Sequence, residues 1–212
     1  KNLIGAFYPP AIVVVDPDTL VTLSRREFRA GLYEVIKYGL IAEPSLLDLL
    51  ERHLDAVLSQ QGDALSEVIR TCCRIKAEVV SADEHERGLR RILNFGHTLG
   101  HALESTTGYK RLRHGEAVGL GMRAALALGV ARGVTPAPLA ARATALIARL
   151  GPLPSVADVT PAAALAAAKH DKKVVNGRLH FVLVHDTGAT TVDDVTPKEL
   201  RAALAAVNVR GR

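Results

Sequence analysis

The chain has 212 residues, a formal net charge of +5, 48% hydrophobic residues and 4% aromatic residues, with no Trp and two Cys. This length is enough for one domain with its own hydrophobic core. We expect neither a membrane span, because no apolar run reaches the required ~20 residues, nor a signal peptide. Cys72 and Cys73 are adjacent, which excludes a disulfide-rich secreted scaffold and favours a cytoplasmic location.

The positive charge is spread along the chain, without a basic tail and without aromatic residues between the basic ones. This pattern argues against a nucleic-acid-binding surface. Attraction of a small anionic substrate accounts for the same net charge.

The N-terminal elements are predicted to be a strand and a capped helix. Residues 11–15 form a β-branched run that ends at Asp16-Pro17, which predicts a short strand. Ser24 and Glu27 have the spacing of a capping box, so a helix is expected to begin there and run to about Leu40. We expect residues 1–20 to be the end of a preceding domain or a linker strand, and residues 21–212 to form one helical domain.

The remaining elements predict a mainly α, multihelical fold with a few short β-strands. A loop is expected over residues 108–113, directly before His114, and Thr196-Pro197 is expected to begin a last helix. Residues 179–184 predict a strand for which residues 190–192 are a candidate partner. The other expected helices cover residues 45–58, 64–82, 86–106, 115–132, 137–150 and 161–169.

The expected helix over residues 86–106 carries an unusual polar stripe. On a helix, Glu86, Arg90, Asn94, His97 and His101 share one face, which presents a carboxylate, a guanidinium, an amide and two imidazoles. The glycines at 88, 96 and 100 each cost about 1 kcal/mol relative to Ala in a helix interior, which indicates close approach by another helix or a ligand. The alternative is a helix with satisfied polar groups at a packing interface.

Two histidines at this spacing are a candidate metal site. His97 and His101 stand four residues apart, a separation that lets two imidazoles bind one zinc ion. Candidates for a further ligand are His114 and Glu34, which lies among apolar residues and glycines with Lys37 on the same helical face. Structural histidines share this spacing, and Glu34 with Lys37 could equally form an ordinary surface pair worth tenths of a kcal/mol.

Several blocks of sequence together resemble the C-terminal part of the 3-dehydroquinate synthase family. Their order and approximate spacing match over nearly the whole chain, and as a set they are highly specific. The blocks cover residues 1–7 (KNLIGAF), 28–39 (FRAGLYEVIKYG), 75–80 (IKAEVV), 88–104 (GLRRILNFGHTLGHALE), 114–118 (HGEAV) and 171–173 (DKK).

The chain departs from the family in one respect. The family's proteins are longer, and their N-terminal half holds the glycine-rich loops for NAD, whereas this sequence has no strand followed by a G-x-G-x-x-G loop. The chain opens inside a family block, at Lys1-Asn2. We therefore expect a C-terminal portion of the enzyme, inactive alone, weakly zinc-binding and possible as a monomer, whereas the full-length family is usually dimeric.

The resemblance implies a chemistry and a role for particular residues. The family converts 3-deoxy-D-arabino-heptulosonate 7-phosphate into 3-dehydroquinate and phosphate in the shikimate pathway, as an NAD- and zinc-dependent carbon–oxygen lyase, with cobalt as an alternative metal. Glu34, His97 and His114 match its metal ligands. The implied catalytic residues are Lys37, Lys76, Glu86, Arg90, Asn94 and His101. The implied substrate-binding residues are Lys1, Asn2, Lys172 and Lys173, and Asn2 and Thr22 are implied at the cofactor.

Three alternative functions, from two classes, remain open on the sequence alone. Another sugar-phosphate cyclase such as 2-deoxy-scyllo-inosose synthase, or a zinc-dependent glycerol-type dehydrogenase, has the same architecture. A helical metal-binding module without catalysis is the alternative from a different class. Arg90 with Asn94, and the Asp171-Lys172-Lys173 block, favour a substrate that bears a carboxylate.

Overall fold

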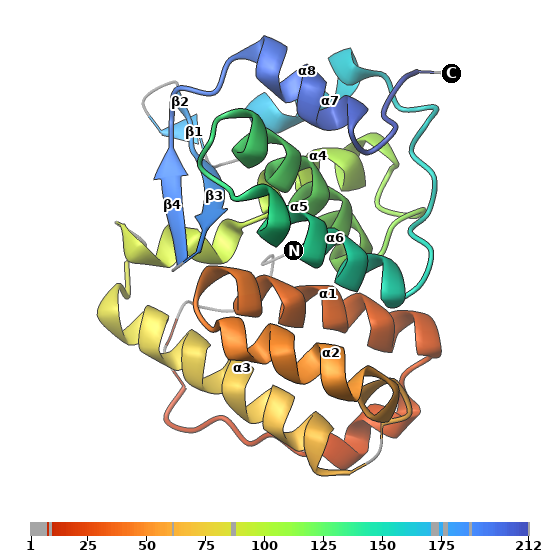
Figure 1. Ribbon diagram of the computed structural model, residues 1–212, viewed down its shortest axis with the longest axis vertical. Coiled ribbons are helices and arrows are strands. Elements are labelled where there is room, and N and C mark those ends of the chain that lie inside the picture. Colours follow the sequence, from red (N-terminus) through yellow and green to blue (C-terminus); the bar gives the residue numbers. More distant parts are fainter. Residues whose placement is uncertain are drawn as a thin grey trace.

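The computed structural model describes residues 8, 10–60, 62–85, 88–170, 174–175, 178–186 and 188–211, and it is mainly α-helical, as predicted (Figure 1). The helices are α1 (Arg25–Ile41), α2 (Pro44–Leu58), α3 (Asp63–Ala82), α4 (His97–Thr106), α5 (His114–Ala131), α6 (Ala137–Arg149), α7 (Pro161–His170) and α8 (Pro197–Ala205), with the 3-10 helices η1 (Pro17–Thr22) and η2 (Leu89–Asn94). The strands are β1 (Val174–Val175), β2 (Arg178–Leu179), β3 (Phe181–His185) and β4 (Gly188–Val192).

Helix α5 lies at the centre of the molecule. It packs against α1 on one side and against α4, α6, α8 and β3 on the others (Figure 1). Most of its residues from Gly115 to Gly129 are buried, as expected for a helix that is apolar on all faces. Helices α2 and α3 lie on the opposite side of α1, so α1 is sandwiched between the two halves of the fold.

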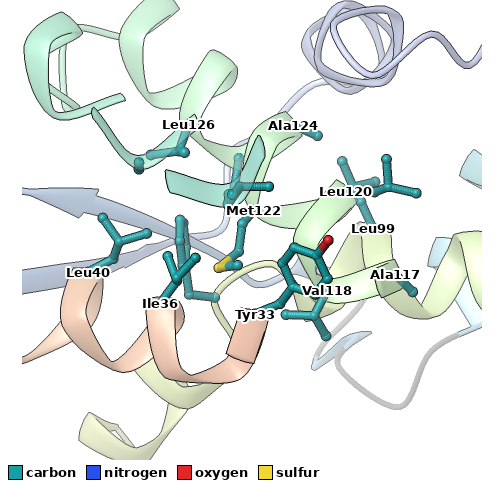
Figure 2. Close-up of a cluster of buried hydrophobic side chains, with 14 of the residues drawn as sticks. Tyr33, Ile36, Leu40, Leu99, Ala117, Val118, Leu120, Met122, Ala124 and Leu126 are labelled. Atoms are coloured by element: carbon teal, nitrogen blue, oxygen red, sulfur yellow. The ribbon is translucent and has the colours of Figure 1, made fainter. Parts of the chain in front are cut away.

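The core between α1 and α5 is formed by large apolar side chains. Ile36 of α1 and Met122 of α5 are fully buried, and Tyr33 and Leu40 extend the same contact along α1 (Figure 2). Burial of one such side chain stabilises the fold by about 1.5–3 kcal/mol. This contact fixes the relative position of α1 and α5, which carry two of the candidate metal ligands.

The predicted caps and the predicted hairpin are confirmed. The Ser24 side chain accepts a hydrogen bond from the Glu27 backbone N–H at the start of α1, and Thr196 with Glu199 forms a capping box at the start of α8. Strand β3 pairs with β4 in antiparallel register, with Val182 opposite Thr191. None of the described helices is long and apolar enough to cross a membrane.

The predicted strand over residues 11–15 is wrong. These residues have no regular secondary structure, and Ile12 and Val14 are 77% and 83% exposed. A β-branched run forms a strand only when a neighbouring strand offers hydrogen bonds, and no described residue supplies one here.

The predicted continuous helix over residues 86–106 is also wrong. The chain forms η2, leaves helical geometry at Phe95 and Gly96, and begins α4 at His97. Gly96 has a φ of +76°, a conformation that favours glycine. Consequently Arg90 and Asn94 do not share a helical face with His97 and His101, and Glu86 lies outside the described residues.

The glycines of this region serve the close approach of helix α5. A Cβ at Gly96 would lie 2.6 Å from the Met122 side chain, and a Cβ at Gly100 would lie 3.0 Å from the Ala117 carbonyl oxygen. The predicted close approach is therefore confirmed at these two glycines, and the approaching group is another helix. Gly88 has nothing within 4 Å of such a Cβ and does not fit this explanation.

Candidate metal and substrate site

Three helices bring Glu34, His97 and His114 together. Glu34 lies in the middle of α1, and the two histidines are the first residues of α4 and α5. The Glu34 Oε1 atom lies 3.2 Å from His97 Nε2 and 3.3 Å from His114 Nε2. One donor atom from each side chain lies within 4.8 Å of the others, so the set can hold a metal ion. One carboxylate and two imidazoles are a donor set typical of catalytic zinc.

Local packing places the start of α5 against α1. Gly115 approaches α1 so closely that a Cβ there would lie 1.8 Å from the Ala30 carbonyl oxygen, one turn before Glu34. The Arg26 guanidinium donates to both carboxylate oxygens of Glu116, at 2.7 Å each, which joins the first turns of the two helices. These contacts hold His114 near Glu34.

The two imidazole rings are oriented by hydrogen bonds at their other nitrogen. His97 Nδ1 lies 3.1 Å from the Phe95 carbonyl oxygen, and His114 Nδ1 lies 3.1 Å from Glu104 Oε2. Because a carbonyl oxygen only accepts, Nδ1 of His97 carries the proton and Nε2 keeps its lone pair when the ring is neutral. Metal-binding histidines are commonly oriented in this way.

The protonation states of Glu34 and His97 suit a cation site, whereas His114 must first lose a proton. Burial raises the pKa of Glu34, but hydrogen bonds from His114 and His97 and the charge of Lys37 outweigh it and hold that pKa well below its usual range. Burial lowers the pKa of His97, which favours the neutral ring that a metal requires. Hydrogen bonds to Glu104 and Glu34 raise the pKa of His114 to about 9, so a cation must displace a proton there.

Lys37 is a buried partner of Glu34. Its ammonium group forms an ion pair with Glu34 Oε2, which leaves Oε1 facing the two histidines. The Lys37 side chain is only 5% exposed, so this is not the ordinary surface pair that the sequence left open. A buried ammonium is costly unless it is paired, and Glu34 is the paired carboxylate.

His101 lies beside the three-residue cluster. Its ring centroid lies 5.4 Å from that of His97 and 5.6 Å from that of His114. His101, Glu104 and His114 also form a group whose donor atoms lie within 4.8 Å of one another. The structure therefore places three imidazoles together, with Glu34 against His97 and His114.

For the other predicted site residues that it describes, the structure gives the exposure of each and, for Arg90 and Thr22, a hydrogen bond. Arg90 is half-buried and donates to the Glu84 carbonyl at 2.7 Å, Lys76 is exposed on α3, and the exposed Thr22 hydroxyl donates to the Thr19 carbonyl at 2.9 Å. Asn94 is half-buried at the end of η2. The residues that lie outside the described ranges are Lys1, Asn2, Glu86, Lys172 and Lys173.

Glu104 is a site residue that the sequence analysis did not single out. It stands seven residues after His97 and three after His101, so all three occupy one face of α4. That spacing on one helical face is a sequence signal from which Glu104 could be identified.

Comparison with known proteins shows which family the chain belongs to. Residues 31–174 match the family described as 3-dehydroquinate synthase C-terminal. The chain belongs to the 3-dehydroquinate synthase family. It is 50% identical over 209 residues to the 3-dehydroquinate synthase of Dichelobacter nodosus. The aligned region covers 97% of this chain and 56% of that protein. It is 47% identical to that of Solibacter usitatus, covering 97% of this chain and 59% of that protein. This member of the family thus spans less than three-fifths of the length of these relatives.

Solved structures show the same fold. A 2-epi-5-epi-valiolone synthase from Streptomyces hygroscopicus subsp. jinggangensis, with NAD+ and Zn2+ bound, superposes with a TM-score of 0.83 at 31% identity, covering 98% of this chain and 58% of that one. A 2-deoxy-scyllo-inosose synthase complexed with carbaglucose-6-phosphate, NAD+ and Co2+ gives a TM-score of 0.71 at 24% identity, covering 96% and 58%, which shows the fold alone.

Proposed function

We propose that the chain is the metal- and substrate-binding part of a 3-dehydroquinate synthase, which converts 3-deoxy-D-arabino-heptulosonate 7-phosphate into 3-dehydroquinate and phosphate. The observation that carries the proposal is the meeting of Glu34, His97 and His114 from three separate helices. About half of the chain's residues are identical to those of 3-dehydroquinate synthases. This similarity supports 3-deoxy-D-arabino-heptulosonate 7-phosphate as the substrate, in preference to the substrates of other sugar-phosphate cyclases.

Glu34, His97 and His114 would hold a zinc or cobalt ion. Such an ion, when bound, supplies a Lewis acid that acidifies a substrate hydroxyl and polarises the ketone formed from it. The chain's own contribution is to fix the donors: Lys37 holds Oε2 of Glu34 while Oε1 faces the imidazoles. With three protein ligands, positions remain open for substrate oxygens.

His101 is proposed to exchange a proton with the substrate beside the metal. Its ring adjoins the rings of both proposed histidine ligands, so it borders the place where a bound substrate would lie. An imidazole is suited to this work because it can both accept and donate a proton.

The anionic groups of the substrate call for positive charge and hydrogen-bond donors. We assign this to Arg90, Asn94, Lys37, Lys76 and the Lys172–Lys173 pair, with Glu86 as a further polar group. A guanidinium such as that of Arg90 offers a planar pair of donors that matches a carboxylate or a phosphate. Lys1 and Asn2 are proposed at the phosphate, and Asn2 with Thr22 near NAD+, most of whose site we place in the longer protein.

We further propose a cytoplasmic enzyme that is a homodimer at full length, with residues 21–212 as the helical domain and residues 1–20 as its connection to the preceding one.

The test of the proposed activity is phosphate release by the full-length protein with NAD+ and Zn2+. Release from 3-deoxy-D-arabino-heptulosonate 7-phosphate and not from glucose 6-phosphate is expected. The reverse preference would indicate another cyclase, and metal binding without turnover of either would indicate a non-catalytic module.

A further inference from the structure

Glu104 is a buried carboxylate that the proposed function does not use. It lies on α4, its side chain is 12% exposed, and its Oε2 lies 3.1 Å from His114 Nδ1. The opposite ring nitrogen, Nε2, lies 3.3 Å from Glu34 Oε1. The His114 ring is therefore held between two carboxylates, one at each nitrogen.

The two histidines of the cluster differ in how they are supported. His97 is 12% exposed and its Nδ1 is held by the backbone carbonyl of Phe95, so its orientation follows from the chain itself. His114 is 44% exposed and is the first residue of α5. Its ring has less packing to restrain it, and Glu104 supplies the restraint from a neighbouring helix.

We propose that Glu104 is a positioning residue that holds His114 with Nδ1 protonated and Nε2 directed at the divalent cation bound with Glu34 and His97. This inference rests on the metal site of the proposed function. A neutral imidazole has one lone pair, so only one of its nitrogens can bind a cation while the other donates a hydrogen bond. An ionised carboxylate only accepts, so Glu104 selects the form of the ring that leaves Nε2 free.

A different arrangement is conceivable, because His101, Glu104 and His114 could hold an ion themselves. The His114 nitrogen that faces Glu104 is Nδ1, and a neutral ring that bound an ion there could not bind a second ion at Nε2. The two arrangements are thus exclusive, and they assign opposite roles to Glu34 and Glu104. In ours Glu34 is the ligand, because its Oε1 lies near Nε2 of both histidines.

The experiment is a titration of the purified chain with Co2+, followed by visible absorption, which gives the dissociation constant and the stoichiometry. Wild type is expected to bind one Co2+. Glu104→Ala is expected to bind one Co2+ with 10–100-fold weaker affinity, the usual effect of losing an outer hydrogen-bond partner. Glu104→Gln keeps an acceptor oxygen and the side-chain shape, so its affinity is expected to lie between the two. The loss of Co2+ affinity in Glu34→Gln is expected to be far larger than that in either Glu104 variant.

Thr135→Val is the matched control for general destabilisation. Thr135 is buried, and its hydroxyl donates to the Val184 carbonyl at 2.6 Å, so the variant loses a buried hydrogen bond without touching the histidines. Its Co2+ affinity is expected to equal that of wild type. Equal weakening by Thr135→Val and Glu104→Gln would overturn the proposal, as would wild-type affinity in both Glu104 variants. Abolished binding in Glu104→Gln with binding kept in Glu34→Gln would make Glu104 a ligand. A wild-type chain that binds no Co2+ would instead refute the metal site itself.

Discussion

Gly115→Ala tests whether the contact between α5 and α1 builds the site. The new Cβ would lie 1.8 Å from the Ala30 carbonyl oxygen, and Cβ contacts under 3.0 Å essentially never occur, so the start of α5 must move by more than 1 Å. Overpacking of this kind costs about 1–3 kcal/mol of unfolding free energy. His114 is the adjacent residue, so the same displacement separates it from Glu34. Metal ligands tolerate about 0.2 Å, and we expect at least a tenfold loss of Zn2+ affinity.

The assay is urea denaturation of the metal-free chain together with Zn2+ titration against a chelating dye. Gly31→Ala is the matched control, because Gly31 lies next to Ala30 within α1 and has nothing within 4 Å of a Cβ. That variant is expected to keep its Zn2+ affinity and to gain about 0.5–1 kcal/mol of unfolding free energy. The reasoning is refuted if Gly115→Ala matches wild type in both stability and affinity.

Three further predictions use separate features of the chain. Because the pKa of His114 is raised to about 9, its proton competes with a cation below that pH, so Co2+ affinity should rise about tenfold between pH 7 and pH 8 and level off above pH 9. Calorimetric titration at each pH checks this, and a flat profile contradicts it. Thr196→Ala removes the cap of α8 and should lower the unfolding free energy, measured by urea denaturation, by about 1 kcal/mol. An unchanged unfolding free energy would mean that the cap hydrogen bond does not stabilise the fold. Val14→Lys changes an exposed side chain, so the unfolding free energy in urea should change by less than about 0.5 kcal/mol, and a larger loss would mean that Val14 is packed against the fold.

Local sequence signals predicted the helices well because their causes are local. Ser24 and Thr196 mark helix starts through hydrogen bonds that span three residues, and both caps are present. The polar stripe identified His97 correctly as part of a cluster, although for a partly wrong reason. Only His97 and His101 lie on one helical turn; Arg90 and Asn94 belong to η2.

The errors have non-local causes. A glycine at position 96 is consistent with either a helix interior under close packing or a break with positive φ. In the structure it is a break, with a φ of +76°, and it is also closely approached by Met122 and Val118 of α5. The run over residues 11–15 has strand composition, but pairing depends on a partner that composition does not reveal. Glu104 was missed because its role depends on His114, which follows it by ten residues on another helix.

The metal content of the purified chain and of four alanine variants tests the three-residue site directly. It is measured by atomic emission after equilibrium dialysis against a Zn2+ buffer, so that a weakly held ion is also counted. We expect one Zn2+ per wild-type chain and a near-complete loss in Glu34→Ala, His97→Ala and His114→Ala. His53→Ala, an exposed histidine on α2, should keep its metal. Unchanged metal content in the three site variants, or equal loss in His53→Ala, would contradict the claim that these three side chains form one metal site.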